Sequence, residues 1–144
     1  MARTLIDLAN RIGNLEQDIK DESNRVIVNF TNAFVQHLAE STPVDTSNAI
    51  SNWQVSLDAP TYDEILPHVE GLGGSTWIDS AKITISESIR IMRGRKFGQP
   101  VFVYNNADYI LELDAGSSRQ EPAGFVDRSM VKALREFDSF NLNR

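Results

Sequence analysis

The sequence predicts an α+β domain in which a small antiparallel sheet is flanked by a long N-terminal helix, a middle helix and a C-terminal helix. Three observations lead to this prediction. Apolar residues recur at helical spacing through the first 40 residues or so, two short segments read as strands, and helical spacing returns twice later in the chain. With 144 residues, 41% of them hydrophobic, the chain can bury one core. We therefore expect a single domain over 1–144, with residues 1–41 as the long helix and 42–144 as the sheet and remaining helices.

A long helix is predicted from about Thr4 to Glu40. It has to end before Pro43, because the residue that precedes a proline is pushed toward extended geometry. A helix of this length cannot bury all of itself against so small a domain, so we expect its surplus to dock on other subunits. The apolar stripe follows a spacing of three and four and then drifts, which suits a helix that exchanges one partner surface for another; its members are Leu5, Leu8, Ile12, Leu15, Ile19, Phe30, Phe34 and Leu38.

The elements after this helix follow from local pattern. Alternation at Trp53, Val55 and Leu57 is typical of a half-buried strand, and the continuous apolar run Pro100–Tyr104 favours a central strand. The connection 58–75 is acidic and contains prolines and glycines, so a long mobile loop with one short strand near Ile65 and Val69 is expected. The remaining expectations are a loop at 41–48, a helix at 76–92, a turn at 105–108, a short apolar segment at 109–113, a loop at 114–124 and a helix at 125–140.

No residue pattern points to catalysis or to a cofactor. The two histidines, His37 and His68, lack any nucleophile motif around them. His68 and the nearby carboxylates match no metal-ligand spacing, which favours a solvated acidic loop. The glycine-rich segment 71–75 lacks the lysine of a phosphate-binding loop and is read as a hinge. With no cysteine in the chain, thiol chemistry and disulfides are excluded. We expect no enzyme, no cofactor and no metal.

The sequence also predicts a protein outside membranes. No apolar run reaches the roughly 18 residues that span a bilayer, and the N-terminus has an acidic residue, Asp7, where a signal peptide would be apolar. The lack of cysteine agrees with assembly in a reducing cytoplasm.

The net charge of −6 is unevenly distributed. Residues 41–79 contain six acidic and no basic residues, whereas residues 80–100 contain five basic residues and one acidic residue. Such blocks can meet head-to-tail between identical neighbours, and the alternative is two solvated faces that never meet. The overall acidity disfavours DNA binding by the basic cluster. The candidate subunit-interface residues are Asp45, Asp63, Glu64, Arg90, Arg93, Arg95, Lys96, Arg119 and Glu121.

Several segments together resemble one family of phage proteins. The segments TPVDT (Thr42–Thr46) and NWQVSL (Asn52–Leu57) resemble its "TPVDTG…NWQVSL" stretch. GQPVFVYNNADY (Gly98–Tyr109) resembles its "GQPIYITNNLPY" stretch, and GSSRQEPAGFV (Gly116–Val126) its "GSSKQAPAGFV" signature. In this order, they are similar to the neck or tail-completion (minor tail) proteins of long-tailed, lambdoid-type bacteriophages. Ser47 stands where the family commonly has glycine, so a less left-handed loop is expected there.

The resemblance implies a structural virion protein that forms a ring, generally hexameric, at the head–tail junction. It would act as a neck, tail-completion or tail-terminator subunit that joins the connector to the tail tube, and the choice among these rings stays open. Its partners would be identical subunits and the neighbouring connector and tail-tube or tail-terminator proteins. Genomic DNA would pass through the lumen without specific binding. The protein would be assembled in the host cytoplasm and reside in the virion. Independently of the resemblance, we hypothesise that loop 58–75 orders only on contact with another ring, which would make assembly sequential.

Two other classes compete with this interpretation. One is a non-viral oligomeric adaptor or protein-binding module that acts through the N-terminal helix. The other is a small hydrolase with an unrecognised site, which no residue pattern favours.

Overall fold

Helix α1 (Leu5–Ser41) is the longest element of the computed structural model, which describes residues 4–137. A capping box opens it: Asp7 N donates to Thr4 Oγ1, and Thr4 N donates to the Asp7 carboxylate, both at 3.1 Å. At the other end, Thr42 is extended and its backbone N–H still donates to Leu38 O. The helix thus ends just before Pro43, as the proline predicts.

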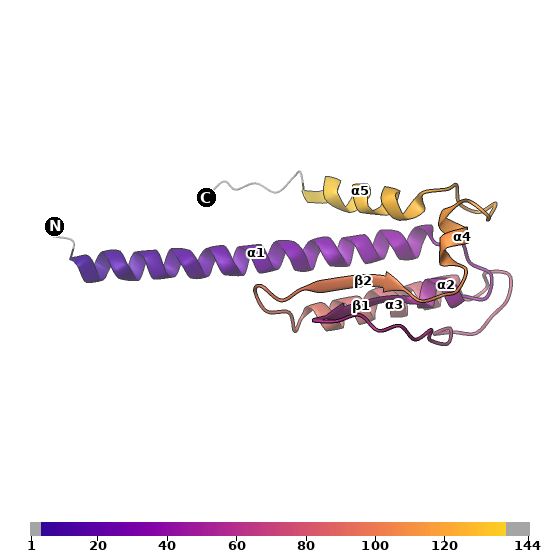
Figure 1. Ribbon diagram of the computed structural model, residues 1–144, viewed down its shortest axis with the longest axis horizontal. Coiled ribbons are helices and arrows are strands. Elements are labelled where there is room, and N and C mark those ends of the chain that lie inside the picture. Colours follow the sequence, from indigo (N-terminus) through magenta and orange to yellow (C-terminus); the bar gives the residue numbers. More distant parts are fainter. Residues whose placement is uncertain (1–3, 138–144) are drawn as a thin grey trace.

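The expected α+β fold is confirmed (Figure 1). The predicted strand at 53–57, the helix at 76–92 and the start of the last helix at 125 agree with the structure; residues 138–140 of that helix lie outside the described residues. The further elements are α2 (Asn48–Ser51), β1 (Trp53–Leu57), α3 (Trp77–Met92), β2 (Val101–Asn105), α4 (Ile110–Asp114) and α5 (Phe125–Phe137).

Three expectations about the middle of the chain are wrong. The described segment 58–75 contains no strand near Ile65 and Val69. A one-turn helix, α2, occupies the end of the expected loop and the start of the alternating segment. Ser47 takes a left-handed conformation, with φ 65°, although a less left-handed path was expected. It is held there because its buried hydroxyl pairs with Thr76 Oγ1 at 2.8 Å.

The two strands form an antiparallel pair in which Val55 lies opposite Val103. Since the sheet has two strands within residues 4–137, each keeps one edge that no described strand covers, and all five residues of β2 are half-buried. The apolar run at 101–104 is therefore not a central strand. It is apolar because one of its faces packs against α1, where Val103 contacts the core around Phe34.

The core lies along the C-terminal half of α1. Figure 1 shows α5 along one side of this half and the strands with α3 along the other. Buried side chains from α1, β1 and α5 meet in one cluster, and Trp53 donates its indole N–H to Thr42 Oγ1 at 2.7 Å. The largest core cluster consists of Phe34, Leu38, Trp53, Phe125 and Ala133.

Candidate interaction surfaces

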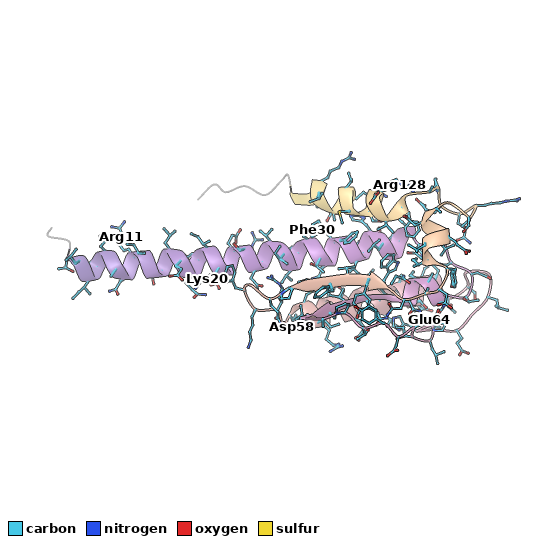
Figure 2. The ribbon with its side chains drawn as sticks, viewed as in Figure 1. Arg11, Lys20, Phe30, Asp58, Glu64 and Arg128 are labelled. Carbon is cyan, nitrogen blue, oxygen red and sulfur yellow. The ribbon has the colours of Figure 1, made fainter. Side chains whose placement is uncertain are left out.

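The acidic connection and the basic turn after α3 lie at opposite ends of the body; Arg119 is the exception among the basic candidates, because its neighbour Gln120 binds Val44 at the acidic end. On the basic side, Arg95 Nη1 donates to Asn24 Oδ1, near the middle of α1, at 2.6 Å. On the acidic side, Asp45 follows the C-terminus of α1 by a few residues. Asn24 and the C-terminal end of α1 are about 25 Å apart along the helix axis, from the rise per residue of an α-helix. Figure 2 shows the same separation, with Glu64 at the far end of the body from the basic turn. One chain therefore cannot bring the two blocks together.

One member of the acidic block breaks this separation. Asp58 lies at the basic end, where Gln99 Nε2 donates to its carboxylate at 2.8 Å. The basic turn after α3 is thus partly neutralised within the chain.

Five of the nine candidates already have partners inside the chain. Arg95 joins the turn after α3 to α1 through Asn24 and to Gln99 O at 3.0 Å. These five candidates therefore make hydrogen bonds or ion pairs within the chain, and whether any of the nine meets a neighbour stays a prediction. The other four pairs join Asp45 Oδ1 to Gly73 N (2.8 Å), Glu64 to Asn48 (2.6 Å), Arg90 to Glu87 (2.7 Å) and Glu121 to Arg128 (2.6 Å).

The ion pair between Arg90 and Glu87 shifts the pKa of both of its members. The hydrogen bond from Arg90 lowers the pKa of Glu87, and the same bond raises the pKa of Arg90. Both side chains are exposed, so solvent screens the pair and its contribution to stability is small.

Four candidates remain free for contact: Asp63, Arg93, Lys96 and Arg119. Their side chains are exposed and make no hydrogen bond or ion pair with any residue that the structure describes. Arg93 and Lys96 flank the turn after α3, Asp63 lies in the acidic connection, and Arg119 lies at the tip of the loop before α5. These four are the charges best placed to meet a neighbouring subunit.

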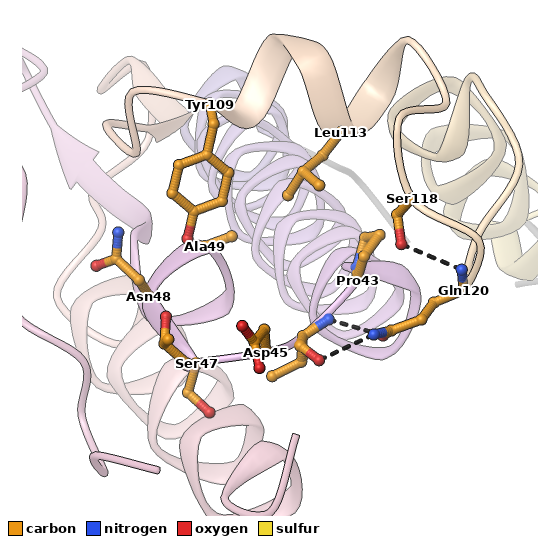
Figure 3. A pocket seen from close by; sticks show the side chains of 11 residues that line it. Pro43, Asp45, Ser47, Asn48, Ala49, Tyr109, Leu113, Ser118 and Gln120 are labelled. Carbon is orange, nitrogen blue, oxygen red and sulfur yellow. Dashed lines mark hydrogen bonds between the residues drawn. The ribbon is translucent and has the colours of Figure 1, made fainter. Parts of the chain in front are cut away.

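Two segments that the sequence analysis treated separately meet in space. The amide of Gln120 binds the backbone of Val44 twice: Val44 N donates to Gln120 Oε1 at 2.9 Å, and Gln120 Nε2 donates to Val44 O at 3.0 Å (Figure 3). This joins the GSSRQEPAGFV segment to the TPVDT segment. No local sequence signal distinguishes Gln120 from other polar loop residues, so the sequence analysis missed it.

The loop 115–124 is held from its other side as well. Arg128 donates to Glu121 and to Pro122 O at 2.8 Å. Asp114 closes the base of the loop, because its carbonyl accepts from Gly124 N at 2.7 Å and its carboxylate accepts from Val126 N at 3.0 Å. The tip that carries Arg119 is therefore presented on a fixed support.

An open cavity of about 330 Å³ lies beside the Gln120–Val44 link. Figure 3 shows the Tyr109 ring and the Leu113 side chain directed toward the same space as Asp45. The lining of the cavity is partly apolar and includes one carboxylate, that of Asp45. This composition suits a single side chain of a neighbouring molecule.

The connection 58–75 is bound to the body in the single chain. The buried amide of Asn52 accepts from Ile65 N at 2.8 Å and donates to Ile65 O at 2.9 Å, and His68 N donates to Ser51 Oγ at 2.9 Å. Asn106 Nδ2 donates to the carbonyls of Thr61 and Asp63. These hydrogen bonds hold the connection 58–75 against the body, whereas the sequence predicted a mobile loop that orders only on contact with a second ring.

The two histidines lie in different surroundings. Burial lowers the pKa of His68, which favours its neutral form. His37 Nε2 pairs with Glu136 at 2.6 Å and thereby joins α1 to α5. Among residues 4–137, no three metal-binding side chains of the His, Cys, Asp and Glu types form a cluster.

The N-terminal half of α1 projects beyond every other described element (Figure 2). We call residues 5–19 the arm. Its five seam residues, Leu5, Leu8, Ile12, Leu15 and Ile19, are between 51 and 84% exposed. This is the surplus length that the sequence predicted, and none of it is covered by the chain's own core.

Comparison of the chain with protein-family models, with curated proteins and with solved structures found no match. Within the described residues, no helix is both long and apolar enough to cross a membrane.

Proposed function

We propose that this protein is a structural, non-enzymatic subunit of a long-tailed phage particle. It would assemble in the host cytoplasm into a ring, most simply a hexamer, at the junction of head and tail. There it would serve as a neck, tail-completion or tail-terminator subunit between the connector and the tail tube. Phage DNA would pass through the ring without specific contacts.

One observation carries this proposal. The segments that resemble the phage family are also those that contact one another: Gln120 of the last motif binds Val44 of the first, and Thr42 accepts from Trp53 of the second. The second motif also forms β1, whose partner β2 comes from the third. If these motifs together form one functional end of a subunit, they are expected to lie next to one another in space, as they do here.

The charge layout supports self-assembly. Free Asp63 in the acidic connection and free Arg93 and Lys96 at the basic turn are complementary between copies, and such complementarity guides association and fixes its register. Head-to-tail contacts of this kind close into a ring when the rotation between neighbours allows it.

Native mass spectrometry and electron microscopy of the full chain test the proposal. With rising concentration we expect closed rings, six subunits being the simplest result. A species that never exceeds a dimer at any concentration would contradict it. In the genome, portal, capsid and tail-tube genes are expected to lie alongside the gene.

Two charge variants test the interface within this proposal. Arg93→Glu should lower the fraction of rings, and Asp63→Lys in the same chain should restore part of it, because the two sites exchange sign. Lys132→Glu, an exposed charge on α5, serves as the control and should leave ring formation unchanged. Equal ring formation in all variants would remove the electrostatic contact from the proposal.

The exposed arm also favours a second candidate, an oligomeric adaptor that grips a different protein through the N-terminal helix. This candidate predicts that the full chain forms no closed ring and that its gene lies outside any cluster of virion genes. The same two observations therefore separate the candidates.

A further inference from the structure

The arm contains an unpartnered coiled-coil seam. With Leu5 as position a, positions a hold Leu5, Ile12 and Ile19 and positions d hold Leu8 and Leu15, the 3–4 alternation of a heptad repeat. All five side chains are mostly exposed in the single chain. Isoleucine at position a combined with leucine at position d favours two-stranded, parallel packing.

The charges beside the seam are complementary between two parallel copies. Arg11 occupies position g and Glu16 occupies position e of the next heptad, the two positions that face each other across a parallel pair. Arg11 is exposed and has no ion pair within the described chain. Glu16 contacts only Lys20 of its own helix, at 2.6 Å, and that contact lowers the pKa of Glu16. Each pair of arms would thus gain two Arg11–Glu16 contacts.

Antiparallel arrangements of the same two arms are less favourable. If Ile12 lies opposite Leu8 of the second copy, the two Arg11 side chains face each other. If Ile12 lies opposite Leu15, Leu5 faces Glu22 instead of an apolar residue. Parallel pairing in register is the arrangement in which all five described seam residues meet apolar partners.

The seam ends where the arm joins the body. Glu22 takes the next position d, and it already pairs with Arg25 on its own helix. Two Glu22 carboxylates facing each other would repel, and from Val28 onward α1 contacts its own core. The seam available for pairing is therefore the part of α1 that projects from the body, residues 5–19 (Figure 1).

A lipid surface fits the arm poorly. Residues 5–22 contain five acidic and two basic residues and no aromatic residue. Helices that lie on membranes are rich in lysine and arginine on their polar face and carry tryptophan or phenylalanine on the other. The acidity likewise argues against nucleic acid.

We propose that the arm is a homotypic pairing site: residues 5–19 of two copies of this chain form a parallel, in-register helical pair, with Arg11 of each copy beside Glu16 of the other. The seam is shorter than the roughly three to four heptads that mark a sustained coiled coil. Pairing is therefore weak in dilute solution and becomes strong when another contact gathers the bodies and raises their effective concentration. The inference does not depend on a phage role, since it concerns only the arm and a second copy.

Cysteine cross-linking of the full chain tests the pairing directly, because the natural sequence has no cysteine. Leu8→Cys should form a disulfide-linked dimer under mild oxidation, since the two positions d of a parallel pair lie face to face. In either antiparallel register these residues are offset by four residues or more, about 6 Å along the axis, which together with the spacing between the helices is too far for a disulfide. Asn10→Cys, on the outer face of the arm, is the matched control and should cross-link at least ten-fold more slowly. Equal rates for the two variants would overturn the proposal.

Charge variants provide a second, independent readout. Arg11→Glu should lower the dimer fraction several-fold in sedimentation, and Arg11→Glu with Glu16→Arg should restore it. Ile12→Lys should abolish pairing while the thermal unfolding of the body stays unchanged, because the arm makes no contact with the core. An unchanged dimer fraction in Ile12→Lys, or vesicle binding that this variant abolishes, would contradict the proposal. Loss of rings with pairing intact would instead count against the proposed function alone.

Discussion

The two halves of α1 follow the same helical period and yet have opposite surroundings. In the C-terminal half, Phe34, Val35 and Leu38 are buried under the strands, α3 and α5, whereas no other element within residues 4–137 covers the arm. Periodicity therefore indicates which face of a helix is apolar, and the position of the later elements decides whether that face is covered within the chain. The arm's apolar face is exposed with respect to the described residues, which is the observation on which the proposed pairing rests.

The largest expected effect compares one leucine from each half. Leu38→Ala should lower the free energy of unfolding by about 2–5 kcal/mol, because Leu38 is 0% exposed and a cavity would replace it. Leu15→Ala, the same change on the arm, should cost less than about 0.5 kcal/mol in dilute solution. Urea unfolding of both variants measures the difference. Similar losses would mean that the arm is covered within the chain.

Thr42→Val tests the point where α1 ends and the body begins. Thr42 Oγ1 donates to Leu38 O at 2.6 Å and accepts from the Trp53 indole at 2.7 Å, and the isosteric variant leaves that buried N–H without a partner. We expect a loss of about 1–3 kcal/mol, measured by thermal unfolding. Thr46→Val, whose hydroxyl makes no hydrogen bond with described residues, is the control. Equal stability of the two variants would show that the Trp53 bond is not needed.

Gln120→Ala tests the link between the loop 115–124 and the start of the body. Losing both hydrogen bonds to Val44 should cost about 1 kcal/mol, because the site is only partly buried. Amide exchange at Val44 should become faster, while exchange in the arm stays the same. The exposed neighbour Arg119→Ala should change neither. Slow exchange at Val44 in Gln120→Ala would contradict the assignment of this link.

The smallest effect concerns the start of the arm and depends on pH. Hydrogen bonds from Thr4 lower the pKa of Asp7. Because the folded pKa lies below the unfolded one, the capping box is intact above the ordinary titration range of aspartate. It is lost as the pH falls through the lowered pKa. The protection of the amides of residues 5–9, measured as exchange relative to the intrinsic rate at each pH, should therefore fall in acid while that of the body is unaffected. Asp7→Asn should exchange faster at neutral pH and show no acid step, and an acid step that persists in it would point to another group.

Much of the fold could be read from local pattern because its elements are defined by neighbours in sequence. The period of α1, the alternation of Trp53, Val55 and Leu57, and the proline at 43 act within a few residues, so they predict the elements without tertiary information. Local pattern did not predict a short helix or the position of a strand within the sheet. One turn of helix at 48–51 has too few residues to show a period, and the edge position of β2 depends on how many strands follow it in space.

Predicting the candidate interaction residues required the tertiary fold, more than predicting the helices and strands did. The charge blocks at 41–79 and 80–100 predicted two oppositely charged surfaces, but they could not indicate which charges are already paired within the chain. Arg95 binds Asn24, which is 71 positions away in the sequence, and Gln120 binds Val44, which is 76 positions away. A local sequence pattern cannot predict contacts between residues so far apart in the chain. The sequence alone thus determined the three longer helices, the segments that form the two strands, the apolar stripe of α1 and the uneven charge. Only the tertiary structure decided which part of that stripe is covered and which charges face solvent, because burial and pairing depend on residues brought together from distant parts of the chain.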